Sequence, residues 1–203
     1  MISVKICGIT NVQDAVSVAE AGVNALGFVF YPKSKRYIVP EKAREIIKEL
    51  PPFVSTVGLF VNEKKENVVD ILRKCPVDVL QFHGDETPEY CNQFNIRIIK
   101  AFRVKDDFSY DIFSGYSTCA FLLDGFAYGE YGGTGVSFDW DIAVMAKKFG
   151  RIVLAGGLHP ENMEAALKKV RPYGIDLSSG VEVEPGIKDI DKVKEIVKIC
   201  SFF

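Results

Sequence analysis

The chain has few of the residues that bind metal ions. It contains only two histidines, and its five cysteines form no Cys-x-x-Cys pair. The cysteine spacings match no zinc pattern, and His, Asp and Glu are nowhere dense enough for a metal site. We therefore expect no bound metal. An odd number of unpaired thiols is typical of a reducing cytoplasm, so we expect a cytoplasmic protein.

Long apolar runs and a strong excess of one charge are also lacking. No run approaches the roughly 18 residues of a membrane helix. The N-terminal stretch lacks the basic region, apolar run and small-residue cleavage site of a signal peptide. The formal net charge of −2 does not favour a polyanionic partner. We expect no membrane or nucleic-acid partner.

What the chain does have is the composition of an ordinary globular protein. Of its 203 residues, 48% are hydrophobic and 26% are charged, which is enough apolar material for a full core. No linker and no low-complexity segment interrupts it. We therefore expect a single domain over residues 1–203.

Short apolar runs alternate with helical patterns along the chain. The predicted strands are residues 4–7, 25–30, 56–61, 77–82, 97–101, 120–123, 151–155 and 173–177. The clearest predicted helices are 12–21, 41–50, 138–149, 160–170 and 189–200, whereas 105–115 indicates only a short helix. This alternation is typical of parallel βαβ units. About eight units predict an α/β fold, a compact (β/α)₈ TIM barrel rather than an open sheet.

In such a barrel the strand ends meet at one face, where ligands bind. Cys7 ends the first strand, His83 follows the fourth and Asp124 follows the sixth. Cys7 is either a base or nucleophile with a stabilised thiolate, or an inert buried thiol. Asp124 is either a general acid with a pKa raised by burial, or a solvated turn residue. His83 is more typical of a structural or supporting position.

Two pairs of small residues follow the seventh and eighth strands. They are Gly156-Gly157 and Ser179-Gly180, and a longer glycine-rich loop covers residues 129–135. Backbone N–H groups at such turns bind anions, and phosphate sites in these barrels commonly use the loops after strands seven and eight. Ordinary tight turns are the alternative. Together the two pairs predict a phosphate site.

The loop after the second strand is basic. It contains Lys33, Lys35 and Arg36. Arg36 is best suited to hold a carboxylate, because its planar fork contacts two oxygens. A solvated basic loop is the alternative.

Short motifs along the whole chain resemble one family, phosphoribosylanthranilate isomerase of tryptophan biosynthesis. They are KICGIT at 5–10, GFVF at 27–30, SKRY at 34–37, QFHG at 81–84, LLD at 122–124, GGTG at 132–135, FDW at 138–140, LAGG at 154–157, PEN at 160–162 and DLSSGVE at 176–182. Phe82 and Gly125 depart from the family pattern, and neither departure removes a functional side chain.

The resemblance implies an Amadori rearrangement of N-(5-phosphoribosyl)anthranilate to 1-(2-carboxyphenylamino)-1-deoxyribulose 5-phosphate, without a cofactor or metal. It implies that Asp124 is the general acid, Cys7 the general base and Arg36 the ligand of the anthranilate carboxylate. It places the phosphate on Gly157, Ser179 and Gly180, with Gly156 in the same turn. It also puts His83 and Asp176 near the ribose hydroxyls. The only partner implied is the small-molecule substrate, and the chain is a monomer or a homodimer.

Two other functions stay open. Another phosphosugar barrel enzyme, such as an epimerase or indole-glycerol-phosphate synthase, would show further metal ligands or a catalytic Lys and Glu at the strand ends. A non-catalytic phosphosugar-binding barrel would lack the acid or the base, and both are present.

Overall fold

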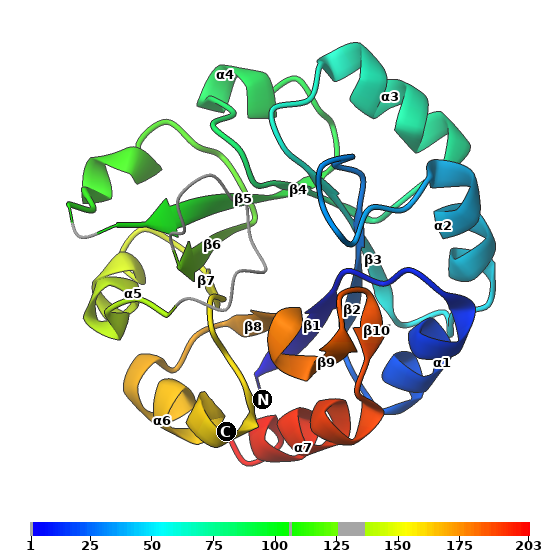
Figure 1. The fold of residues 1–203 in the computed structure, drawn as a ribbon. Coiled ribbons are helices and arrows are strands. Elements are labelled where there is room, and N and C mark those ends of the chain that lie inside the picture. The colour runs from blue at the N-terminus through cyan, green and yellow to red at the C-terminus, as the bar shows by residue number, and fades with distance from the viewer. Residues whose placement is uncertain (1, 106, 126–136) are drawn as a thin grey trace.

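The computed structural model describes residues 2–105, 107–125 and 137–203. Eight parallel strands form a closed barrel, in which β8 pairs with β1 (Figure 1). The strands are β1 (Ser3–Cys7), β2 (Ala25–Val29), β3 (Ser55–Phe60), β4 (Val79–Phe82), β5 (Arg97–Val104), β6 (Ala120–Gly125), β7 (Ile152–Leu154) and β8 (Gly174–Leu177). The predicted TIM barrel is therefore confirmed.

Helices surround the barrel (Figure 1). They are α1 (Val12–Glu20), α2 (Pro40–Lys48), α3 (Lys65–Lys74), α4 (Pro88–Cys91), α5 (Trp140–Ala146), α6 (Pro160–Val170) and α7 (Ile190–Cys200). A 3₁₀ turn, Tyr110–Phe113, lies between β5 and β6, where the sequence indicated only a short helix. A second one, Ser179–Val181, follows β8.

Capping side chains lie at the starts of several of these helices. Asn11 accepts a hydrogen bond from the backbone N–H of Asp14 at the start of α1. Thr87 caps α4, in which Pro88 is the first residue. Asp139 caps α5. Each cap satisfies an N–H group that has no partner inside its helix, and this fixes where the chain turns from loop to helix.

The core has an inner and an outer layer. Leu122, Val153 and their neighbours fill the inside of the barrel. Between barrel and helices lies the larger layer, which includes the aromatic rings of Phe28, Phe60 and Phe82. Apart from Cys7, the cysteines Cys75, Cys91 and Cys200 are buried, as small apolar residues would be, and Cys119 is half-buried. The alternation of side chains along each strand produces the two layers.

The structure corrects the sequence prediction at β5, β6 and after β8. Strand β5 extends to Val104 and strand β6 to Gly125. Asp124 is therefore a strand residue, and it pairs with Arg103. Charged residues end the apolar runs there, which is why the sequence predicted shorter strands. A hairpin of β9 (Glu182–Glu184) and β10 (Ile187–Lys188) was not predicted, because strands this short show no alternation. The glycine-rich loop 129–135 lies outside the described residues.

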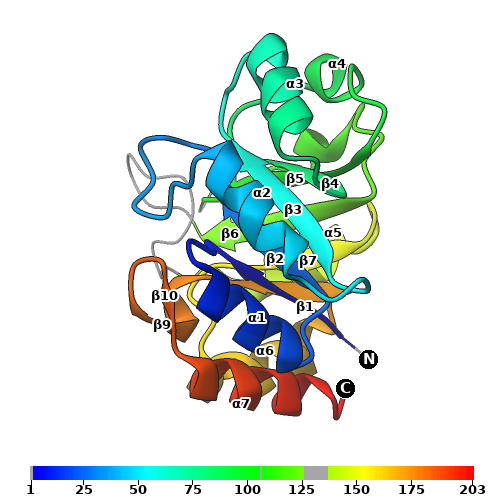
Figure 2. The ribbon, with the colours of Figure 1, turned by 90° about the vertical axis from the view of Figure 1, so that its right-hand side faces the viewer.

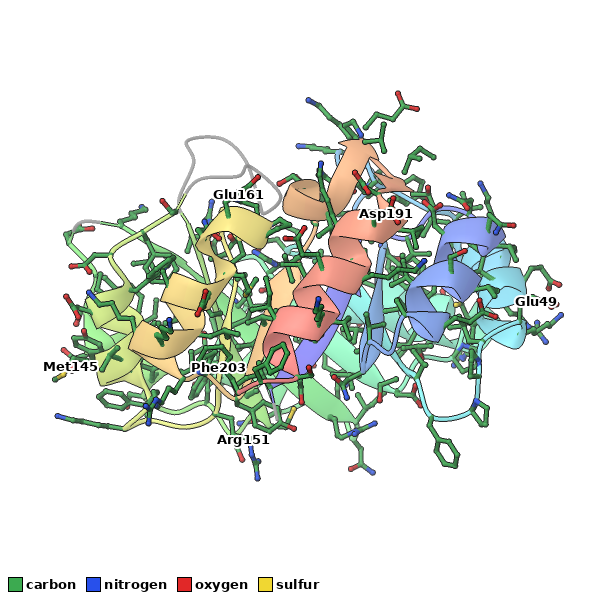
Figure 3. All side chains as sticks on the ribbon, turned by 90° about the horizontal axis from the view of Figure 1, so that it is seen from below. Glu49, Met145, Arg151, Glu161, Asp191 and Phe203 are labelled. Carbon is green, nitrogen blue, oxygen red and sulfur yellow. The ribbon has the colours of Figure 1, made fainter. Side chains whose placement is uncertain are left out.

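The hairpin and the helix starts lie at one end of the barrel. Figure 2 shows β9 and β10 at the end opposite to both chain termini. In Figure 3, Glu161 and Asp191 at the beginnings of α6 and α7 lie at the hairpin end, and Arg151, just before β7, lies at the other. The loops that follow the strands therefore meet beside the hairpin. No helix in the part of the chain described here has the length and apolar character to cross a membrane.

Candidate active site

A pocket opens at the end of the barrel where the strands finish. The space inside it is about 650 Å³, open solvent at its mouth included. All nine site residues predicted from the sequence line it: Cys7, Arg36, His83, Asp124, Gly156, Gly157, Asp176, Ser179 and Gly180. Lys33 and Lys35 are exposed and are not among its lining residues.

Cys7 lies at the end of β1 above a buried ion pair. Lys5 precedes it by two residues and therefore faces the same side of the strand. The Lys5 Nζ atom donates a hydrogen bond to Asp176 Oδ2 over 2.8 Å. Burial raises the pKa of the Cys7 thiol, and the positive charges of Lys5 and Lys188 only partly offset that effect. The two cations therefore favour the Cys7 thiolate, whereas burial of the thiol opposes its ionisation.

Asp124 projects from β6 into the same pocket and is only 4% exposed. This excludes the solvated turn that the sequence left open. His83 Nε2 lies 3.2 Å from Asp124 Oδ2, although the angle does not meet that of a hydrogen bond. Gln81 Nε2 lies 2.9 Å from His83 Nδ1. If the amide nitrogen donates there, the neutral imidazole carries its proton on Nε2, facing Asp124.

Arg36 reaches the pocket across the turn after β1. A Cβ atom on Gly8 would lie 2.5 Å from Arg36 Cδ, so only glycine leaves room for this side chain. The guanidinium is bound by Glu182, and its Nη2 atom lies 2.6 Å from Glu182 Oε2. The basic residue that faces the pocket is therefore held in place by an acidic one.

The loops after β7 and β8 contact each other through their backbones. A Cβ atom on Gly180 would lie 1.9 Å from the carbonyl oxygen of Leu158. Asn162 Nδ2 donates to the carbonyl oxygen of Gly157 over 2.7 Å, which ties the first loop to α6. Ser178 Oγ donates to the carbonyl oxygen of Cys7 over 3.1 Å and connects the second loop to β1. Small residues are needed here because the backbones approach so closely.

Sequence reasoning missed Lys5, Glu182 and Lys188. Lys5 was open to prediction, because alternation along a strand puts it on the side of Cys7. Lys188 gave no such signal, since it contacts Cys7 across 181 residues of sequence. Within the described ranges, no three side chains of His, Cys, Asp or Glu are grouped so as to hold a metal ion.

Comparison with known proteins agrees with this geometry. The family model described as N-(5'phosphoribosyl)anthranilate (PRA) isomerase matches residues 4–199. The chain belongs to the phosphoribosylanthranilate isomerase family. The family, the barrel fold and the isomerase function expected from the sequence are thereby confirmed.

Individual members of the family are similar over the full length. The N-(5'-phosphoribosyl)anthranilate isomerase of Geotalea uraniireducens is 54% identical, over 98% of this chain and 98% of that protein. The crystal structure of the phosphoribosyl anthranilate isomerase of Thermotoga maritima has a TM-score of 0.91 at 45% identity, with complete coverage of both chains. A second structure, of such an isomerase in complex with reduced 1-(o-carboxyphenylamino)-1-deoxyribulose 5-phosphate, has a TM-score of 0.88 at 42% identity, and the match covers both chains completely.

Proposed function

We propose that this member of the family catalyses the Amadori rearrangement of N-(5-phosphoribosyl)anthranilate with Asp124 as general acid and Cys7 as general base. The reaction moves hydrogen within one molecule, from C2 of the sugar to C1. It therefore needs one proton donor and one proton acceptor, and no external oxidant or reductant.

Ring opening is the step assigned to Asp124. Its carboxyl group donates a proton to the furanose ring oxygen, the bond from that oxygen to C1 breaks, and the anthranilate nitrogen takes up the positive charge as an iminium. The position of Asp124 supports this role, because its side chain is buried and lines the pocket. His83, 3.2 Å away, positions the carboxyl group.

Proton removal is the step assigned to Cys7. The iminium acidifies the C2 hydrogen, so a modest base suffices. The Cys7 thiolate takes that proton and the electron pair forms the enolamine, which tautomerises to the ketone. Lys5 and Lys188 supply the positive charge that makes a thiolate possible in this buried position.

The two ends of the substrate carry negative charge, and the pocket has a suitable group for each. Arg36 binds the anthranilate carboxylate. The backbone N–H groups of Gly157, Ser179 and Gly180, with Gly156 in the same turn, bind the phosphate. Asp176 and His83 also line the pocket, and we assign them to the ribose hydroxyls.

The observation that carries the proposal is that Cys7 and Asp124, from strands far apart in sequence, line one pocket together with both anion-binding groups. Cys7→Ala and Asp124→Ala test it. Each variant should fold, keep its circular dichroism spectrum and lose about 10²–10⁴-fold in kcat. Turnover is followed by the loss of anthranilate fluorescence. A folded variant with the activity of the parent protein would remove that residue from the mechanism, and a parent protein without turnover would favour a binding function.

The remaining expectations belong to the same proposal. The chain acts as one domain over residues 1–203, in the cytoplasm, as a monomer or homodimer. Its small-molecule substrate is its only obligatory partner. Size-exclusion chromatography with light scattering distinguishes the two oligomeric states.

A further inference from the structure

A buried ionic network lies behind Arg36. The Arg36 Nε atom lies 2.9 and 3.0 Å from the two carboxylate oxygens of Glu182, and Nη2 lies 2.6 Å from Oε2. One edge of the guanidinium is thus gripped by a carboxylate. Such paired contacts fix the plane of the guanidinium as well as its position.

Lys188 lies on the far side of Glu182. Its Nζ atom is 2.6 Å from Glu182 Oε1 and 2.6 Å from the carbonyl oxygen of Cys7. The Lys188 side chain is completely buried, with 0% exposed. A buried ammonium is costly unless it is paired, so a lysine that served only to fasten the hairpin would be a poor choice.

The hairpin that carries these residues is anchored to the start of the chain. Asp14 in α1 accepts a hydrogen bond from the backbone N–H of Lys188 over 2.7 Å. Thr10 donates through Oγ1 to the carbonyl oxygen of Gly186 over 2.7 Å. These two hydrogen bonds hold the hairpin against the start of the chain. The network therefore links Arg36 to Cys7 at the end of β1.

Glu182 is shared between two cations. Burial raises the pKa of Glu182, but Arg36 and Lys188 outweigh this effect and hold it below its ordinary value, so Glu182 is ionised at neutral pH. Burial lowers the pKa of Lys188, and the negative charge of Glu182 only partly offsets that effect. The contact with Lys188 therefore keeps Glu182 in the ionised form that binds Arg36.

We propose that Glu182 and Lys188 are positioning residues for substrate binding. Glu182 fixes the orientation of the Arg36 guanidinium, which holds the carboxylate of the substrate, and Lys188 fixes the Glu182 carboxylate from its other side. This inference rests on the proposed role of Arg36.

Glu182→Gln and Lys188→Met test the proposal, each alone and combined with Arg36→Ala. With Arg36 present, we expect Glu182→Gln to raise KM about tenfold while kcat falls no more than about threefold. Lys188→Met should raise KM by a similar factor and should also lower kcat, because Lys188 favours the Cys7 thiolate as well. The inhibition constant of free anthranilate should rise by a similar factor, and that of inorganic phosphate should stay unchanged. After Arg36→Ala, neither change should raise KM further, because both act through Arg36.

Asp78→Asn is the matched control for loss of stability. Asp78 accepts hydrogen bonds from Thr56 at the start of β3, at the other end of the barrel. This variant should melt at a lower temperature with an unchanged KM. If Lys188→Met does not fold, the double variant Glu182→Gln, Lys188→Met removes both charges together and is measured in the same way.

The possible outcomes distinguish a failure of this inference from a failure of the proposed function. A folded Glu182→Gln with unchanged KM, an equal rise in both inhibition constants, or a KM increase that persists after Arg36→Ala would each overturn the positioning role alone. An unchanged KM in Arg36→Ala itself would overturn the proposed role of Arg36 and, with it, this inference.

Discussion

Lys5 and Asp176 form a buried ion pair across the seam where the barrel closes. Their Nζ and Oδ2 atoms lie 2.8 Å apart, and the two residues are paired in register between β1 and β8. Burial lowers the pKa of Lys5, but the negative charges of Asp176 and Cys7 more than compensate and hold it above its ordinary value. The ammonium thus stays charged beneath Cys7, with consequences for both stability and catalysis.

Removal of Lys5 should affect both. Lys5→Met leaves the Asp176 carboxylate buried without its partner, so we expect a loss of about 3–5 kcal/mol in the free energy of unfolding, measured in urea. The double variant Lys5→Met, Asp176→Leu should recover most of that stability. Its Cys7 thiol should still need a higher pH than that of the parent protein to react with an alkylating reagent. Equal alkylation rates in parent and variants at every pH would contradict a role of Lys5 in stabilising the thiolate.

The reactivity of the Cys7 thiol should increase with pH. Because burial raises the pKa of Cys7, only a small fraction is thiolate at neutral pH, and this fraction grows about tenfold per pH unit below the pKa. The sign follows from the thiolate being the nucleophile in alkylation. We expect the rate of alkylation of Cys7 by iodoacetamide to rise between about pH 6 and pH 8, with Cys7→Ala as the control for the other thiols. A rate at Cys7 that is flat or falls over this interval would contradict the raised pKa of this thiol.

A methyl group on Gly180 should disturb phosphate binding. It would collide with the carbonyl oxygen of Leu158 and push the loops after β7 and β8 apart. We expect Gly180→Ala to raise KM and the inhibition constant of inorganic phosphate at least tenfold. Gly174→Ala is the control, since Gly174 lies at the opposite end of β8, against the Ser3 carbonyl. It should cost stability without altering phosphate inhibition; equal effects on phosphate in both variants would contradict a local role.

A second buried ion pair should matter for stability. Lys100 and Glu86 lie 3.0 Å apart, and their side chains are 1% and 2% exposed. Glu86→Gln leaves the Lys100 charge without a counter-ion, so we expect a loss of about 3 kcal/mol on urea denaturation. The exposed pair Lys168–Glu164 is the comparison, and Glu164→Gln there should cost less than about 1 kcal/mol. A Glu86→Gln variant as stable as the parent protein would contradict this account.

The sequence was sufficient to predict the barrel because each of its signals is local. The apolar runs of the strands and the spacing of apolar residues in the helices each depend on a few neighbouring residues. Cys7 and Asp124 were recognisable as site candidates for the same reason, since each lies at the end of a predicted strand.

The contacts that tune the site could not be predicted in that way. The partner of Arg36 is Glu182, and that of Lys5 is Asp176, and both pairings depend on the three-dimensional closure of the barrel. The sequence also placed Asp124 just after its strand and left a solvated turn open, because it could not show that β6 continues past the apolar run. Burial of charge is a property of the assembled fold, and the short hairpin that buries Lys188 leaves no periodic trace.

The pairing of the first strand with the last also sets when the site can exist. Cys7 is synthesised 171 residues before Ser178 and 181 residues before Lys188, and both of these residues contact it. A growing chain therefore has no pocket until the hairpin has been synthesised, and barrel closure must bring together segments of great sequence separation, which is slow. Recovery of activity during refolding thus reports the closing of the ring of strands, and a half-barrel intermediate would be silent in that assay.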